Sequence, residues 1–166
     1  MGVKTKDRDL GAARIRANMR LVDNSYVTIG VHDDAGNYPT GVPVPAVAAW
    51  NEFGTNTIPS RPFLRSAIDV NRRTLQIMHL NFISRLIEGK TTVRQGLESV
   101  GFVIQSMIQA RIEKSNQWAE PNAPSTAASK ASGGGIRGAT PLIKTKLLFR
   151  SIGYKVNLVR SGRVPK

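Results

Sequence analysis

The sequence predicts an α+β fold in which a small, mostly antiparallel sheet packs against long helices, with a long flexible loop in the second half. Three observations lead to this class. Two stretches, one near each end, alternate apolar and polar residues as half-buried strands do. Two long central segments repeat apolar residues at helical spacing. Residues 115–141 are poor in hydrophobic residues and rich in alanine, serine, proline and glycine, which is typical of a loop.

A single domain is expected over residues 1–166, because 40% of the residues are hydrophobic, enough to form one core. No apolar run approaches the ~18 residues that span a bilayer, so no membrane partner is expected. The charged segment from Met1 to Leu10 lacks the apolar core of a secretion signal. The absence of cysteine excludes disulfides and thiolate chemistry.

The first third of the chain is predicted to hold a helix, a strand and a second, short helix. Asp7 to Val22 reads as the first helix, and Tyr26 to His32 alternates as a strand with its apolar residues on one face. Asp33 to Pro45 has the composition of turns. Pro45 to Phe53 favours a short helix, because its middle is rich in alanine.

The middle of the chain predicts two long helices joined by a short link. Pro62 to Glu88 is expected to be one helix that ends at Gly89. Its buried stripe is expected to consist of Leu64, Ile68, Leu75, Met78, Phe82 and Leu86. Thr92 and Gln95 resemble a capping box, which would start a helix that runs to about Lys114. The short link predicts that the two helices form an antiparallel hairpin.

After the loop, the sequence predicts a short helix over Leu142 to Ile152 and a last strand over Tyr154 to Val159. In that strand Tyr154, Val156 and Leu158 share one face.

The charge of the chain is strongly positive, with a net charge of +13. From Pro121 onward there is no Asp or Glu, while nine residues are Lys or Arg. Such a segment predicts contact with a polyanion such as DNA or with an acidic protein, and its composition leaves the two open. The residues expected to make this contact are Lys130, Arg137, Lys144, Lys146, Arg150, Lys155 and Arg160.

No constellation of catalytic residues is evident, so the chain is not expected to be an enzyme or to bind a cofactor or metal. His32 and His79 are the only histidines. His32, Asp33 and Asp34 are adjacent, and such spacing does not match known metal sites. Glu52 has no second carboxylate within a helical turn, as paired acid–base catalysis would need.

The most distinctive stretch is the junction from Trp50 to Arg65, which reads as a helix end at Gly54, a rigid turn and a new helix start. Pro59 and Pro62 flank Arg61, so its guanidinium is expected to point outward or against a fixed acceptor, and to matter more for assembly than for folding. The junction is expected to hold or form an interface with a partner. The predicted interface residues are Trp50, Asn51, Glu52, Phe53, Arg61, Phe63 and, further along, Trp118.

These motifs resemble the neck proteins of tailed bacteriophages, also called head–tail joining, tail-completion or virion morphogenesis proteins. The resemblance rests on Val27–Val31, Tyr38-Pro39, Val47–Thr55 and Ile58–Phe63, and then on Trp118, Pro121–Thr126, Lys130, Pro141–Thr145 and Arg150–Ile152. One departure stands at Lys144-Thr145-Lys146, where the family usually has Asp-Thr-Gly. This change removes an N-capping Asp and adds two positive charges.

The resemblance implies a structural virion protein of the head–tail neck, present in the host cytoplasm during assembly. It implies a ring of copies of the chain, a hexamer or alternatively a dodecamer, in a neck, tail-terminator or tail-completion layer. Its partners would be adjoining neck and tail-tube proteins, with double-stranded DNA in the channel. The alternative from the charge alone is a basic DNA-binding accessory protein of another kind.

Overall fold

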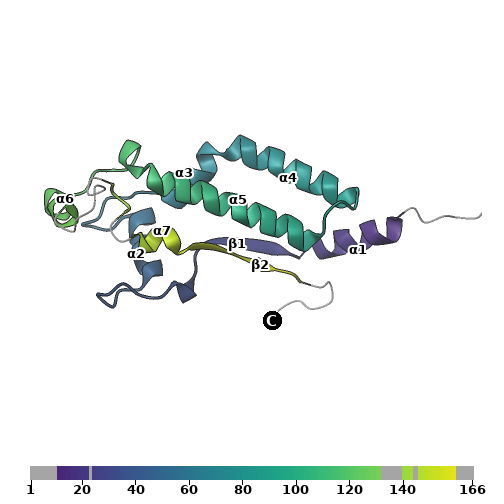
Figure 1. Cartoon of the computed structure of the whole chain (residues 1–166), viewed down its shortest axis with the longest axis horizontal. Coiled ribbons are helices and arrows are strands. Elements are labelled where there is room, and N and C mark those ends of the chain that lie inside the picture. The colour runs from purple at the N-terminus through teal and green to yellow at the C-terminus, as the bar shows by residue number, and fades with distance from the viewer. Residues whose placement is uncertain (1–10, 23, 132–139, 144–145, 160–166) are drawn as a thin grey trace, which may run out of the picture.

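The computed structural model describes residues 11–22, 24–131, 140–143 and 146–159 of the chain (Figure 1). Helices and a two-stranded antiparallel sheet make an α+β fold, as the sequence predicts. In chain order, the elements are α1 (Ala12–Val22), β1 (Tyr26–Val31), η1 (Asp33–Ala35), α2 (Val44–Phe53), α3 (Phe63–Val70), α4 (Arg72–Ile87), α5 (Val93–Glu113), η2 (Ser115–Gln117), α6 (Pro124–Ala131), α7 (Leu147–Arg150) and β2 (Ile152–Asn157).

The sheet joins the first and last strands of the described chain, and α5 lies along one of its faces (Figure 1). Val27 is opposite Val156, Ile29 opposite Tyr154 and Val31 opposite Ile152. Opposed residues share a face, so the apolar side chains of both strands lie together. The predicted apolar face of β1 is therefore confirmed. β2 begins and ends two residues earlier than predicted, because the pairing with β1 fixes its bounds.

The helix α5 organises the other elements, and its glycines allow close approach. A Cβ atom added to Gly101 would lie 2.5 Å from the ring of Tyr154, and one added to Gly96 would overlap the ring of Phe82 in α4. The predicted capping box is confirmed at the start of α5. The Thr92 hydroxyl accepts a hydrogen bond from the Gln95 amide at 3.2 Å, and the Gln95 side chain accepts one from the Thr92 amide at 3.1 Å.

The prediction of one helix from Pro62 to Glu88 is wrong, because the structure divides this segment into α3 and α4 at Asn71. The Asn71 side-chain amide donates to the Ala67 carbonyl at 2.8 Å, and such local bonds compete with a continuous helix. The helix α3 turns Phe63 and Ala67 inward, whereas Ile68, predicted to be buried, is 38% exposed. The helix α4 runs antiparallel beside α5, as expected of a hairpin (Figure 1).

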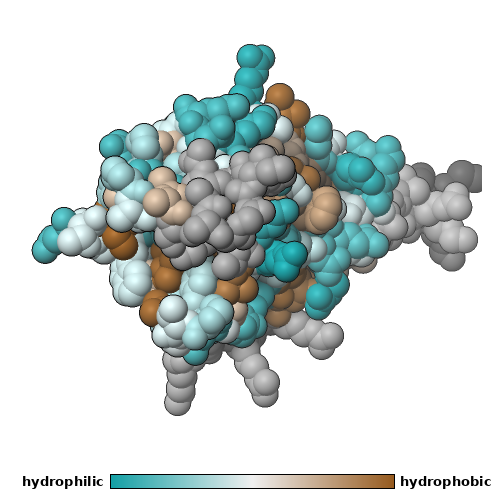
Figure 2. Space-filling view, turned by 60° about the vertical axis from the view of Figure 1, so that its left-hand side comes forward, coloured by the Kyte–Doolittle hydropathy of each residue, from teal (hydrophilic) through white to brown (hydrophobic). Residues whose placement is uncertain are grey.

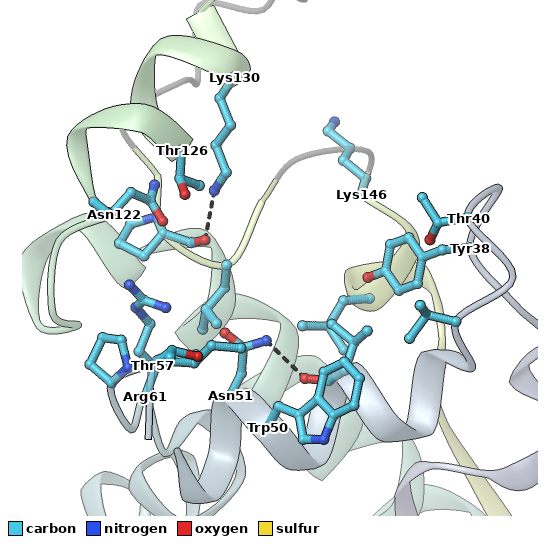
Figure 3. A pocket seen from close by; sticks show the side chains of 18 residues that line it. Tyr38, Thr40, Trp50, Asn51, Thr57, Arg61, Asn122, Thr126, Lys130 and Lys146 are labelled. Carbon is cyan, nitrogen blue, oxygen red and sulfur yellow. Dashed lines mark hydrogen bonds between the residues drawn. The ribbon is translucent and has the colours of Figure 1, made fainter. Parts of the chain in front are cut away.

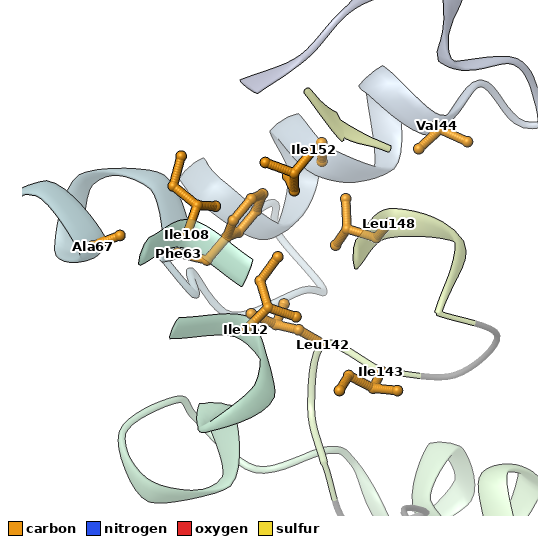
Figure 4. Packing of buried hydrophobic residues seen from close by; sticks show 10 residues of the cluster. Val44, Phe63, Ala67, Ile108, Ile112, Leu142, Ile143, Leu148 and Ile152 are labelled. Atoms are coloured by element: carbon orange, nitrogen blue, oxygen red, sulfur yellow. The ribbon is translucent and has the colours of Figure 1, made fainter. Parts of the chain in front are cut away.

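The main hydrophobic core lies at one end of the molecule, where α2, α3, α7 and the second half of α5 meet (Figure 4). Phe63 is at its centre and is completely buried. The cluster consists of Val44, Ala48, Phe63, Ala67, Ile108, Ile112, Leu142, Ile143, Leu148 and Ile152. None of these residues belongs to α4, which therefore takes no part in the core.

The described part of the predicted loop 115–141 is not a simple loop, because it contains η2 and α6. Pro124 occupies the first position of α6, where proline is well tolerated, and alanines follow it. Residues 132–139 lie outside the described chain. The predicted helix over Leu142–Ile152 shortens to α7, and the predicted first helix is described only from Ala12.

Candidate functional site

The junction between α2 and α3 forms a rigid turn held by backbone hydrogen bonds. Gly54 ends α2 with a φ of 80°, and its amide donates to the Trp50 carbonyl at 2.9 Å. The Thr55 amide donates to the Ile58 carbonyl at 2.8 Å, and the Ile58 amide returns a bond to the Thr55 hydroxyl at 3.0 Å. The positive φ favours glycine here, as the sequence predicts.

Glu52 lies in α2 and caps the next helix, a role that sequence reasoning missed. Its carboxylate accepts hydrogen bonds from the backbone amides of Leu64 at 2.8 Å and Arg65 at 3.1 Å, in the first turn of α3. The Arg65 guanidinium also donates to it, at 2.9 Å. Glu52 is only 2% exposed, so the carboxylate is fully committed within the chain. A negative charge at a helix N-terminus is favourable because it meets unpaired amides and the positive end of the dipole.

Arg61 is buried and points against fixed acceptors, the second of the two expected arrangements. Its Nε donates to the Glu120 carbonyl at 2.7 Å and its Nη2 to the Pro121 carbonyl at 2.9 Å. Its own amide donates to the Asn51 carbonyl. Burial lowers the pKa of Arg61, while the nearby charge of Glu120 acts in the opposite direction. Arg61 thus ties the α2–α3 turn to the chain before α6, which favours a role in folding, and its greater importance for assembly stays a prediction.

The predicted interface residues divide into buried and exposed groups. Phe63 and Glu52 are buried in the single chain, and Asn51 is half-buried with its amide bonded to the Val47 carbonyl at 2.8 Å. These three support the junction, and Asn51 also lines the pocket described below. Trp50 and Phe53 do reach the surface, with 42% and 71% of their areas exposed. The sequence prediction rested on the rigid turn of the junction, which cannot tell which face of α2 meets the core.

Trp118 is held by the end of α5 and is not freely exposed. The Arg111 guanidinium stacks over its ring at 4.2 Å from the centroid, and its indole N–H donates to the Arg111 carbonyl at 2.9 Å. Arg111 also donates to the Ser66 hydroxyl in α3 at 3.0 Å. Trp118 therefore supports the packing of α3 and α5 within the chain, and its contact with another chain stays a prediction.

The predicted basic contact residues have different environments. The Lys130 ammonium donates to the carbonyls of Thr140 at 2.9 Å and Pro141 at 2.7 Å, which joins α6 to the chain before α7. Lys155 pairs with Asp34 at 2.8 Å, which lowers the pKa of Asp34. Lys146 and Arg150 are exposed. Arg137, Lys144 and Arg160 lie outside the described residues.

A pocket of about 430 Å³ opens beside this junction, and the sequence did not predict it (Figure 3). Its walls come from the chain before α2, from α2 itself, from the turn after it and from the ends of α6 and α7. Asn122 lies in the wall, and its buried side-chain nitrogen has no hydrogen-bond partner among the described residues. Burial raises the pKa of Tyr38, another lining residue, so its hydroxyl remains protonated. In the sequence, the pocket was signalled only by the scattered polar residues of the predicted loop 115–141.

The outer side of the helices α3 and α4 carries an apolar surface. Five aliphatic side chains are exposed there, Ile68, Val70, Ile77, Leu80 and Ile87. A groove lined mainly by Ile68, Leu75 and Leu80, with His79 beside them, runs along it. We call these residues the α4 surface. Leu86 is the only fully buried residue of α4 in the described chain.

The end of the molecule that carries α2, α6 and α7 comes forward in Figure 2. There, hydrophobic atoms form separate patches among hydrophilic ones. No cluster of three potential metal ligands occurs among the described residues. The ring of His32 lies 3.1 Å from the Thr28 hydroxyl, a local contact within β1 and its end. None of the helices in the described part of the chain has the length and apolarity that crossing a membrane requires.

No family model, curated protein or solved structure matches the chain. The similarity to phage neck proteins therefore rests on the sequence motifs alone.

Proposed function

We propose that the chain is a structural subunit of the phage head–tail interface, which assembles with copies of itself into a closed ring of the neck or the tail-completion layer. The observation that carries the self-assembly is the α4 surface. A helix of 16 residues with one fully buried side chain gains little from its own chain, and its exposed aliphatic residues favour cover by a neighbour. The assignment to a phage neck is carried by the sequence resemblance.

A ring needs two different surfaces on each subunit, one for each neighbour. The α4 surface supplies an apolar one. The second is the exposed edge of the α2–α3 junction, where Phe53 lies beneath the Arg65 guanidinium, 5.3 Å from ring centroid to the guanidinium carbon. Because Glu52 and Arg61 fix the junction, Phe53 and Trp50 are presented without a large loss of conformational entropy on binding.

The basic residues would then face DNA in the channel or an acidic neighbouring layer. Five acidic side chains of the described chain are already paired with bases, among them Asp34, Asp69 and Glu98. The exposed Lys146 and Arg150 have no ion pair among the described residues. The alternative function, a free DNA-binding accessory protein, is favoured by the same net charge of +13.

The experiment that tests the proposal is native mass spectrometry of the purified full chain over a concentration series, with negative-stain imaging of the species found. One defined oligomer with ring-shaped particles is the expected result. In parallel, binding to a random-sequence DNA duplex is measured across a salt series. A chain that stays monomeric at every concentration, and binds duplex with an affinity that falls steeply with salt, contradicts the ring and supports the alternative.

A further inference from the structure

The pocket beside the α2–α3 junction combines three cationic side chains with no acidic one. Arg61, Lys130 and Lys146 come from three separate segments and line it, while none of the described lining residues is Asp or Glu. Arg61 donates to the backbone carbonyls of Glu120 and Pro121, and Lys130 to those of Thr140 and Pro141, so these bonds orient the two side chains. The charge of Glu120 also acts on Arg61, but the described lining residues include more cations than anions, and this excess attracts an anion into the pocket.

The wall of the pocket also contains a polar group that the described residues leave unsatisfied. The side-chain nitrogen of Asn122 is buried and has no hydrogen-bond partner among the described residues. Buried donors in folded proteins are almost always paired, and an unpaired one in a pocket indicates an acceptor supplied from outside. In Figure 3 Asn122 lies on the same side as Arg61, Thr126 and Lys130, across the pocket from Tyr38 and Lys146.

The remaining walls of the pocket are apolar. They consist of Val47, Trp50, Ile58, Pro59, Leu142 and Leu148, and Trp50 is partly exposed. A volume of about 430 Å³ is within the usual range for ligand sites and exceeds what one carboxylate fills. Apolar walls around one amide donor suit a carboxylate that carries a hydrophobic neighbour better than they suit the strongly hydrated phosphates of a nucleic acid.

The backbone of Lys146 is strained, and this strain is a further indication that the pocket is a binding site. It has a φ of 59°, the only positive φ of a non-glycine residue in the described chain. A side chain other than glycine is strained in this conformation. Strain of this kind is often found at binding sites, where the particular side chain is needed.

We propose that this pocket binds an acidic peptide segment of a partner protein, with its Asp or Glu carboxylates between Asn122 on one side and Lys146 on the other and a neighbouring aliphatic or aromatic residue against Trp50 and Leu142. A different protein is a better source than a second copy, because the chain has 24 basic residues and only 11 acidic ones. The inference goes beyond the proposed ring and does not depend on it.

Two substitutions separate binding from folding. Asn122→Leu removes the unpaired amide, and Lys146→Gly removes both the cation and the positive-φ strain. Each variant is expected to unfold at the same temperature as the wild type or at a higher one, yet to bind the acidic peptide about tenfold more weakly, as the loss of one charge-assisted bond predicts. A residue with a purely structural role would lower the unfolding temperature and leave binding unchanged.

The test begins by selecting short random peptides on the immobilised full chain. The selected peptides are then measured by fluorescence polarisation against the wild type, both variants and Lys90→Glu. Lys90 lies in the α4–α5 connection, at the opposite end of the molecule from the pocket (Figure 1). Lys90→Glu therefore controls for net charge and should bind as the wild type does.

The expected result is enrichment of Asp or Glu beside a hydrophobic residue, with binding lost when that acid is changed to its amide. Selected peptides that lack acidic residues, or that bind both pocket variants as tightly as the wild type, would overturn the inference. Competition by a DNA duplex that disappears in the two pocket variants, but not in Lys90→Glu, would assign the pocket to nucleic acid and overturn it as well.

Discussion

The α2–α3 junction and the helix α4 are close neighbours in the sequence, yet the chain holds them in opposite ways. At the junction, Glu52 and Arg61 are buried and almost every polar atom near them has a named partner within the chain. In α4, one residue is fully buried and several aliphatic side chains face outward. The difference indicates that the junction is held within the single chain, whereas α4 leaves an apolar surface that the proposed ring would cover with a neighbour. Four substitutions test this contrast.

The largest effect is expected at Glu52. Glu52→Ala removes the cap of α3, and the amides of Leu64 and Arg65 lose the acceptor that they have within the chain. We expect the free energy of unfolding, measured in urea, to fall by about 3 kcal/mol. Glu98→Ala, which breaks an exposed pair with Arg94, is the control and should change it by about 0.5 kcal/mol or less. Equal effects of the two substitutions would mean that the junction is no better fixed than the surface.

Arg61→Ala is expected to be the next most severe change. It removes two charge-assisted hydrogen bonds to the chain before α6, so we expect a loss of about 2 kcal/mol in urea unfolding. The sequence alone predicted that folding would change little, and burial of the guanidinium is the reason for the revision. The exposed Arg73 is the control position, and Arg73→Ala should leave stability nearly unchanged. If Arg61→Ala unfolds at the same urea concentration as the wild type, the result would support the sequence prediction that Arg61 matters mainly for assembly.

Gly54 and Gly36 allow the steric and conformational contributions to be separated. They have φ values of 80° and 76°, so an alanine is strained at both. A Cβ atom at Gly54 would lie 3.0 Å from the Ser60 nitrogen and 3.1 Å from the Ile58 oxygen, while at Gly36 nothing lies within 4 Å. Gly54→Ala should therefore destabilise the chain by about 1 kcal/mol more than Gly36→Ala. Equal losses of stability in Gly54→Ala and Gly36→Ala would show that the α2–α3 turn can shift to accommodate the added methyl group.

The smallest effect on folding is expected at Leu80, which is 69% exposed. Leu80→Gln should change the free energy of unfolding of the monomer by no more than about 0.5 kcal/mol. The same substitution should reduce the oligomer in native mass spectrometry, because it places an amide in the apolar α4 surface. Thr74→Ala, at an exposed position of the same helix that does not line the groove, is the control. An oligomer that persists in Leu80→Gln would show that the α4 surface is not an interface.

Local patterns in the sequence predicted much of the fold. The alternation of Tyr26–Val31 gave the strand and its apolar face, Thr92 and Gln95 gave the start of α5, and Gly54 gave the end of α2. Each of these features depends on residues within a few positions of one another, so the backbone and its nearest side chains suffice to specify them. The apolar stripe of α5 was predicted for the same reason.

The tertiary structure decided the features that depend on residues far apart in the sequence. Glu52 became a helix cap because α3 begins 11 residues later with its amides directed at the carboxylate, and no local pattern announces that contact. Arg61 found its acceptors 59 and 60 residues away. The pocket brings together segments from Tyr38 to Leu148. A sequence specifies which groups need partners, but only packing determines which partners they find, because burial and hydrogen bonding are settled by the whole chain at once.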